Sequence, residues 1–162
     1  MRRLIEGVAA GLLVVHFAYL ALTYAALPAM VPTHFDFAGE ADALGPKSNV
    51  WSTWFVSLGL YALLTGVTFV PLSSPLWNLP VSFKGDASGR AERLVGEMMA
   101  WFKVLTAAIF FVVSWAMVRT AHGQAAEGSL LTVLLGATLL PLIILGAYLG
   151  RMTDRDSTGG LS

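Results

Sequence analysis

The stretch GVAAGLLVVHFAYLALTYAALPAM, residues 7–30, contains no Asp, Glu, Lys or Arg. A helix rises about 1.5 Å per residue, so about 20 apolar residues cross a hydrocarbon core of about 30 Å. Arg2 and Arg3 precede this stretch as they would in a signal peptide. However, the run is longer than a signal core, and Ala25-Ala26-Leu27-Pro28 is a poor cleavage site. The pattern predicts a retained transmembrane helix over about 5–27.

Three more spans are expected further along the chain. The other runs without a charged residue are 50–83, 104–118 and 129–150. Three prolines after Val70 should end the second helix there. The third run is short, but apolar residues precede it and Lys103 can snorkel its ammonium group to the headgroups. We therefore expect spans at about 50–70, 98–118 and 129–150, an outer loop at 28–49 and a connection at 71–97.

The composition supports a membrane protein with one domain over residues 1–162. Hydrophobic residues make up 56% of the chain and charged residues 12%, against roughly 25% charged in soluble domains. The expected fold is all-α, with four transmembrane helices in a bundle and a structured extracytoplasmic loop between the first two. A net charge of zero gives no reason to expect nucleic acid as a partner. The absence of cysteine excludes disulfides and thiolate metal sites.

The distribution of Lys and Arg predicts the orientation. Seven lie in the segments on one side of the expected spans and two on the other. The seven are Arg2, Arg3, Lys84, Arg90, Arg93, Arg151 and Arg155, and the two are Lys47 and Arg119. Because cytoplasmic loops are enriched in Lys and Arg, both termini are expected in the cytoplasm and the 28–49 loop outside.

The 28–49 loop carries the densest pattern of polar and turn-forming residues. It reads LPAMVPTHFDFAGEADALGPKS over residues 27–48. Prolines hold the ends extended and two glycines supply turns, while aromatic and polar side chains alternate between them. The candidate recognition residues are His34, Phe35, Asp36, Gly39, Asp42, Gly45 and Lys47.

Three interpretations of this polar cluster stay open. His34 and Asp42 can satisfy backbone donors or pair with Lys47, which would hold the turns of the loop. The cluster can also recognise a peptide or a lipid headgroup. Third, imidazole and carboxylate groups suit zinc, manganese or iron, although the spacing matches no recognised ligand pattern.

His16 lies near the middle of the first expected span, with Tyr19 and Thr23 on the same face. An ionisable residue inside a membrane span is a functional candidate. A neutral histidine bonded to a neighbouring helix is the simplest interpretation. The alternatives are a proton relay and axial ligation of a haem or other pigment; no other cofactor is implied within the chain.

The order Leu27-Pro28, Val31-Pro32-Thr33-His34-Phe35, then Gly39, Asp42, Gly45 and Lys47 at their spacing, resembles a bacterial membrane domain of unknown function. That domain also forms the N-terminal part of SdpI-type immunity proteins. The resemblance covers roughly residues 20–120 and implies a multi-pass protein of the bacterial cytoplasmic (inner) membrane. SdpI-type proteins protect a producing cell from its own toxin and report the toxin to a repressor. Their further C-terminal helices have no counterpart here, so immunity is carried over by analogy.

The sequence contains no catalytic motif, so we expect a non-enzymatic protein. Two functions remain open. One is an SdpI-like sensor or immunity-type factor that recognises a peptide or toxin with its outer loop. The other is an accessory subunit that stabilises a larger membrane complex.

Glycine pairs at Gly7/Gly11 and Gly146/Gly150 have the spacing that lets membrane helices approach closely.

Overall fold

A computed structural model describes residues 1–36, 39–70, 74, 86–124, 136, 139–140 and 142–148. This part of the chain is mostly helical and contains one small sheet. The sheet, which has two strands, is absent from the all-α expectation.

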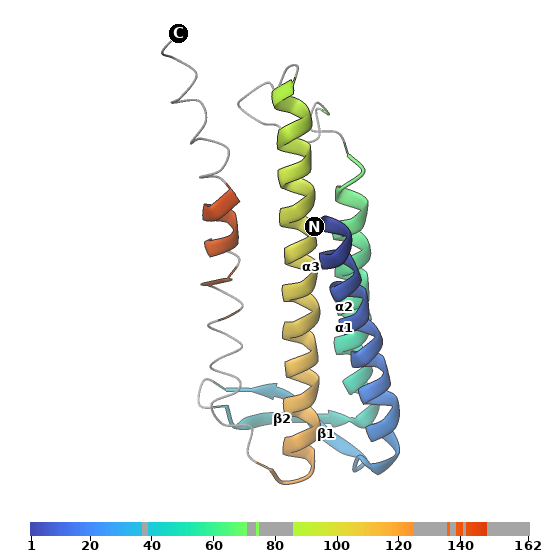
Figure 1. The fold of residues 1–162 in the computed structure, drawn as a ribbon. Coiled ribbons are helices and arrows are strands. Elements are labelled where there is room, and N and C mark those ends of the chain that lie inside the picture. Colours follow the sequence, from blue (N-terminus) through green and yellow to red (C-terminus); the bar gives the residue numbers. More distant parts are fainter. Residues whose placement is uncertain are drawn as a thin grey trace.

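Three long helices lie side by side (Figure 1). They are α1 (Arg2–Thr23), α2 (Val50–Val67) and α3 (Asp86–Ala121). The 3-10 turn η1 (Tyr24–Ala26) follows α1, and η2 (Lys47–Asn49) precedes α2. Each helix is long and apolar enough to cross a membrane, over Arg2–Ala26, Lys47–Val67 and Ala91–Ala121. The described residues thus contain three candidate spans.

The chain between α1 and α2 forms an antiparallel hairpin that lies across one end of the helices (Figure 1). Its strands are β1 (Met30–Phe35) and β2 (Ala41–Pro46). Met30 pairs with Pro46, and Phe35 pairs with Ala41. We call this end of the molecule the hairpin end, and the opposite end, where α1 begins, the N-terminal end.

A cluster of buried apolar residues fixes the hairpin to the helices. This hairpin core consists of Leu20, Leu27, Val31, Val50, Met117 and Val118. Val31 and Val50 have no exposed surface. The cluster joins all three helices to β1, so the hairpin is part of the packed structure.

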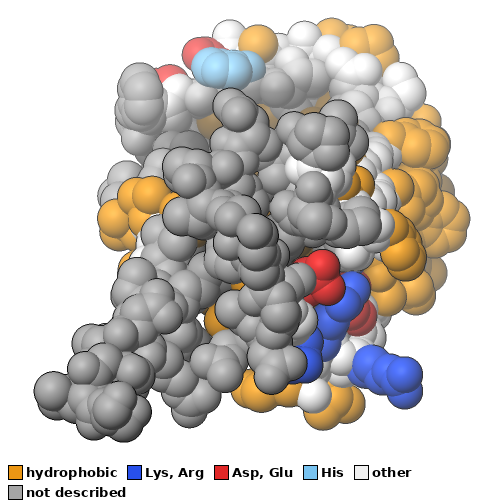
Figure 2. Space-filling view, turned by 90° about the horizontal axis from the view of Figure 1, so that it is seen from above, with side chains coloured by type: hydrophobic (Ala, Val, Ile, Leu, Met, Phe, Trp, Pro, Cys, Tyr) orange, Lys and Arg blue, Asp and Glu red, His pale blue; other side chains and the backbone are white. Residues whose placement is uncertain are grey.

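The flanks of the helices carry the apolar surface that a bilayer would cover. Val14 is 69% exposed, Leu22 83% and Leu63 61%. Figure 2 shows hydrophobic side chains over one flank, and Lys and Arg gathered with acidic groups at the end that faces the viewer. In a soluble domain so much exposed apolar surface would be unusual, and it agrees with helices that face lipid.

The expected third and fourth spans have different outcomes. The expected 98–118 span lies inside α3, which begins at Asp86 and is continuous. Most of the expected 129–150 span lies outside the described residues. Within it residues 142–148 are helical. They lie beside α3, where the Tyr148 hydroxyl donates to Glu97 Oε2 over 3.4 Å.

Candidate functional site

An exposed polar contact joins the two strands of the hairpin. His34 Nδ1 lies 2.6 Å from Asp42 Oδ1, and the two side chains are 68% and 48% exposed. The strand register shifts on both sides of His34, and such irregularities re-aim side chains at functional sites. One of the three interpretations of the cluster pairs these residues with backbone donors or Lys47. In the structure His34 and Asp42 bond to each other, and the pair faces solvent.

The neighbouring side chain of β1 points to the opposite face of the strand. Phe35 is half-buried and packs against the hairpin core and Ala116. His34, one residue earlier, is exposed. This alternation is the one that an extended segment predicts. It places the Phe35 ring on α3 rather than on a membrane surface.

The turn between the strands is held by Asp36. The Asp36 Oδ1 atom accepts from the Glu40 amide at 2.9 Å, and the Asp36 amide donates to Glu40 O at 2.9 Å. Gly39 has a φ of 85°, a conformation that other residues rarely adopt. Asp36 and Gly39 therefore shape the hairpin. Residues 37–38 lie outside the described part of the chain.

Gly45 and Lys47 hold the other end of the hairpin. A Cβ on Gly45 would lie 2.7 Å from Asn49 Nδ2 and 2.9 Å from Thr33 Cγ2, so the close approach requires glycine. The Lys47 ammonium lies 4.8 Å from the centre of the Tyr24 ring, in cation–π geometry. Of the seven candidate residues, only His34 and Asp42 combine high exposure with side chains that bond to no backbone atom in the described structure.

The second polar centre lies between the helices. His16 is fully buried, and its Nε2 atom lies 2.6 Å from Ser114 Oγ on α3. Ser114 Oγ lies 2.5 Å from Thr53 Oγ1 on α2, and Thr53 Oγ1 donates to Val50 O over 2.6 Å. One chain of hydrogen bonds thus joins α1, α3 and α2.

Counting protons assigns the direction of this chain. Three short contacts need three protons, and the hydroxyls of Ser114 and Thr53 supply only two. His16 Nε2 must therefore carry the third and donate to Ser114. His16 Nδ1 is then buried without a hydrogen-bond partner in the described structure. The same holds for Ser57 Oγ, one turn beyond Thr53.

Sequence reasoning found His16 but missed its partners. Thr53, Ser57 and Ser114 are small hydroxyl residues in otherwise apolar spans. Thr53 and Ser57 stand four apart, the spacing that places side chains on one helix face. That spacing was a signal, although Ser and Thr are common in membrane helices. The helix that faces His16 was not readable from the sequence.

The third polar contact is made by Lys103. Its side chain is 1% exposed, and its Nζ atom donates to both carboxylate oxygens of Glu6 at 2.9 Å. The ammonium also lies 5.2 Å from the centre of the Tyr61 ring. A buried ammonium needs a counter-charge, and Glu6 on α1 supplies it.

No group of three or more His, Asp or Glu side chains that could hold a metal ion occurs among the residues with described positions. The His34–Asp42 pair supplies two potential ligands. The metal interpretation therefore has no further support from the geometry of the hairpin.

No curated protein and no solved structure matches the chain. A protein-family model matches one segment of it. This segment runs from within α1, through the whole hairpin, into α2, and so includes His16, His34, Asp42 and Thr53. Over residues 11–60, the chain matches the family described as a domain of unknown function, DUF1648.

Proposed function

We propose that this protein is a non-enzymatic sensor or immunity-type factor of a bacterial inner membrane, which recognises a peptide or toxin at the His34–Asp42 pair. The observation that supports the proposal is the exposure of this pair on a hairpin whose other face is held by the hairpin core. A pair that served stability alone would gain little at this exposure, because exposed ion pairs contribute about 0–1 kcal/mol. A rigid support with an exposed polar pair is what a binding surface needs.

A sensor must also relay the binding of its ligand to the cytoplasmic side. The length of α3 supports this part of the proposal. Near the hairpin end α3 contacts Phe35 through Ala116, and two residues before Ala116 its Ser114 bonds to His16. Further along, Lys103 pairs with Glu6. A shift of the hairpin would therefore act on one continuous helix that reaches the N-terminal end. In the proposed orientation that end faces the cytoplasm, as do both termini.

Complementation of a deletion strain tests the proposal. Deleting the gene should sensitise cells to an envelope-active peptide or toxin, and the wild-type gene should restore resistance. His34→Ala and Asp42→Ala should each fail to restore it at normal protein levels. His122→Ala is the matched control, because His122 is an exposed histidine at the same end of the molecule, and it should restore resistance fully. Full resistance with His34→Ala and Asp42→Ala together would contradict the proposal.

The second candidate, an accessory subunit of a larger membrane complex, is favoured by a different observation. Gly7 and Gly11 on α1 are exposed, and a Cβ on either would meet nothing within 4 Å in the described structure. This face is open to a neighbouring helix. Gentle solubilisation of native membranes tests this candidate. Co-migration with a larger complex that Gly7→Leu abolishes would support it, whereas a free monomer would count against it.

A further inference from the structure

A cavity at the N-terminal end lies where all three helices meet. It measures about 420 Å³ and is lined by Arg2, Arg3, Glu6, Thr65, Thr68, Phe69 and Lys103. Arg2, Arg3 and Glu6 lie in the first turns of α1, Thr65 in the last turn of α2, Thr68 and Phe69 just past that turn, and Lys103 within α3. Since the α1 and α2 positions coincide with the ends of two candidate spans, we place the cavity near headgroup depth in a bilayer.

The charges around this cavity do not balance. Three cations line it and one carboxylate faces them. Lys103 already takes both oxygens of Glu6 at 2.9 Å. Arg2 Nε is 3.8 Å from the same carboxylate and Arg2 is 45% exposed. Among the described residues that line the cavity, about two positive charges therefore have no carboxylate to balance them.

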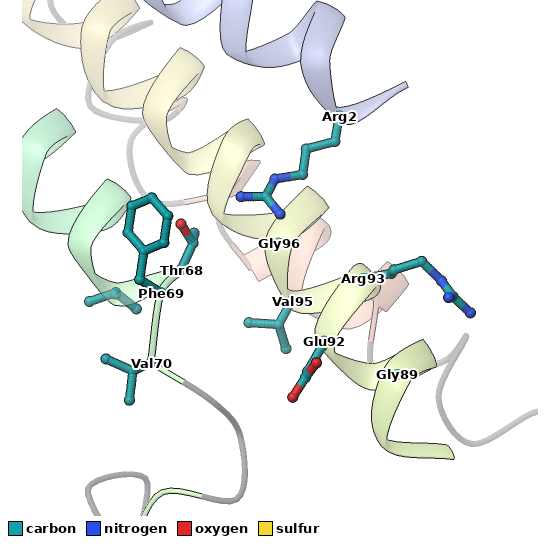
Figure 3. A pocket seen from close by; sticks show the side chains of 10 residues that line it. Arg2, Thr68, Phe69, Val70, Gly89, Glu92, Arg93, Val95 and Gly96 are labelled. Atoms are coloured by element: carbon teal, nitrogen blue, oxygen red, sulfur yellow. The ribbon is translucent and has the colours of Figure 1, made fainter. Parts of the chain in front are cut away.

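The guanidinium of Arg2 is held close to α3. Figure 3 shows its side chain extending from the start of α1 across to Gly96. A Cβ on Gly96 would lie 2.9 Å from Arg2 Nη1 and 3.2 Å from Cζ. The absence of a side chain at Gly96 thus makes room for the arginine.

The neighbouring cavity is partly apolar. It measures about 490 Å³, shares Arg2, Thr68 and Phe69 with the first and adds Val67, Val70 and Val95. Phe69 is 79% exposed. Glu92 and Arg93 also line this cavity, and the Arg93 side chain points away from Phe69 and Val70 (Figure 3). An occupant that contacts both cavities meets three cations in the first, and apolar side chains together with the Glu92 carboxylate in the second.

We propose that the Arg2–Arg3–Lys103 cavity binds the phosphate headgroup of an anionic phospholipid, whose acyl chains lie along Val67 and Phe69. Cations between membrane helices at this depth recognise such headgroups. A free inorganic anion would satisfy the arginines but leave the apolar wall uncovered. The bilayer that covers the flanks supplies the lipid at high local concentration.

Native mass spectrometry of the full-length protein in detergent tests this site. Titration with phosphatidylglycerol should show one molecule of this lipid bound per protein, with a higher affinity than phosphatidylcholine shows in the same titration. Arg2→Gln with Arg3→Gln should weaken that binding by about 30-fold, from about 1 kcal/mol for each cation. Arg119→Gln removes a cation that stacks on Trp115 at the other end, and it should leave the affinity unchanged.

Gly96→Ala tests whether the position of the Arg2 guanidinium matters apart from the net charge of the cavity. It keeps every charge and should weaken phosphatidylglycerol binding by displacing the guanidinium of Arg2. Equal binding by the wild type and the double arginine variant would overturn the proposal, and so would an equal loss in Arg119→Gln. If sodium phosphate displaced the lipid at equal concentration, the cavity would be a site for a free anion, which would also overturn the lipid assignment.

Discussion

A chain of hydrogen bonds connects His16 on α1, Ser114 on α3 and Thr53 on α2, and each of these side chains donates one bond. In lipid such bonds between helices contribute about 0.6 kcal/mol on average and up to about 1.7 kcal/mol. We expect His16→Leu and Ser114→Ala to be non-additive by about 1 kcal/mol in the free energy of unfolding, because each removes the same bond. Unfolding in mixed micelles measures this double-mutant cycle.

Thr23 provides the control for that cycle. Its hydroxyl donates only to carbonyls of its own helix, Tyr19 O and Leu20 O. His16→Leu and Thr23→Ala should therefore be additive. Additivity of His16→Leu with Ser114→Ala would show that the bond does not contribute to stability.

Gly45 is the residue where the hairpin tolerates no side chain. Gly45→Ala would push against Asn49 and Thr33, and overpacking of this kind costs about 1–3 kcal/mol. Gly59→Ala on α2 meets nothing within 4 Å and should be neutral or slightly stabilising. Thermal unfolding of the two variants checks this contrast. A Gly45→Ala variant as stable as Gly59→Ala would contradict the close approach.

At the scale of elements, the first two helices were predictable, whereas the early start of α3 and the hairpin were not. Charge-free runs and the prolines after Val70 set the positions of α1 and α2 within a few residues. Strand β2, with the sequence ADALGP, contains no β-branched or aromatic residue, so its strand propensity is low. It pairs with β1 because the ends of α1 and α2 hold the two segments together over the hairpin core.

The candidate site was predictable only in part for the same reason. The types and positions of His34, Asp42 and His16 were visible in the sequence. The partners of the buried polar residues lie far away in the sequence. His16 and Ser114 are 98 residues apart, and Lys103 and Glu6 are 97 residues apart. One sequence carries no signal of which helix faces meet. The strand register that pairs His34 with Asp42 also depends on irregularities that the sequence does not announce.

The attachment of the hairpin to the helices is testable by hydrogen exchange. Val31→Ala removes methyl groups from a fully buried position and should accelerate exchange of the β1 and β2 amides about five-fold, since losing part of a buried side chain costs about 1 kcal/mol. Met30→Ala changes the adjacent residue, which is 50% exposed, and should leave those amides unchanged. Equal exchange in the two variants would mean that the hairpin core does not hold the hairpin.

At the scale of the whole molecule, the absence of cysteine allows topology to be mapped cleanly. Single cysteines at Ser48 and His122 lie at the hairpin end, and one at Gly89 lies at the other end. In intact cells an impermeant maleimide should label the first two, whereas Gly89→Cys should react only after permeabilisation. This follows from the proposed orientation, in which the three candidate spans cross the membrane with the Arg-rich end inside. Labelling of Gly89→Cys in intact cells would reverse the proposed orientation.

We propose that the His34–Asp42 pair on the hairpin is a recognition surface. Leu44 lies on β2 and is 62% exposed, so a photo-reactive amino acid placed there reports what binds beside the pair. In cells treated with the agent to which the deletion strain is sensitive, we expect an agent-dependent cross-link at position 44. It should be lost in Asp42→Asn and kept in His122→Ala. A cross-link that persists in Asp42→Asn, or no agent-dependent cross-link in the functional protein, would contradict the claim.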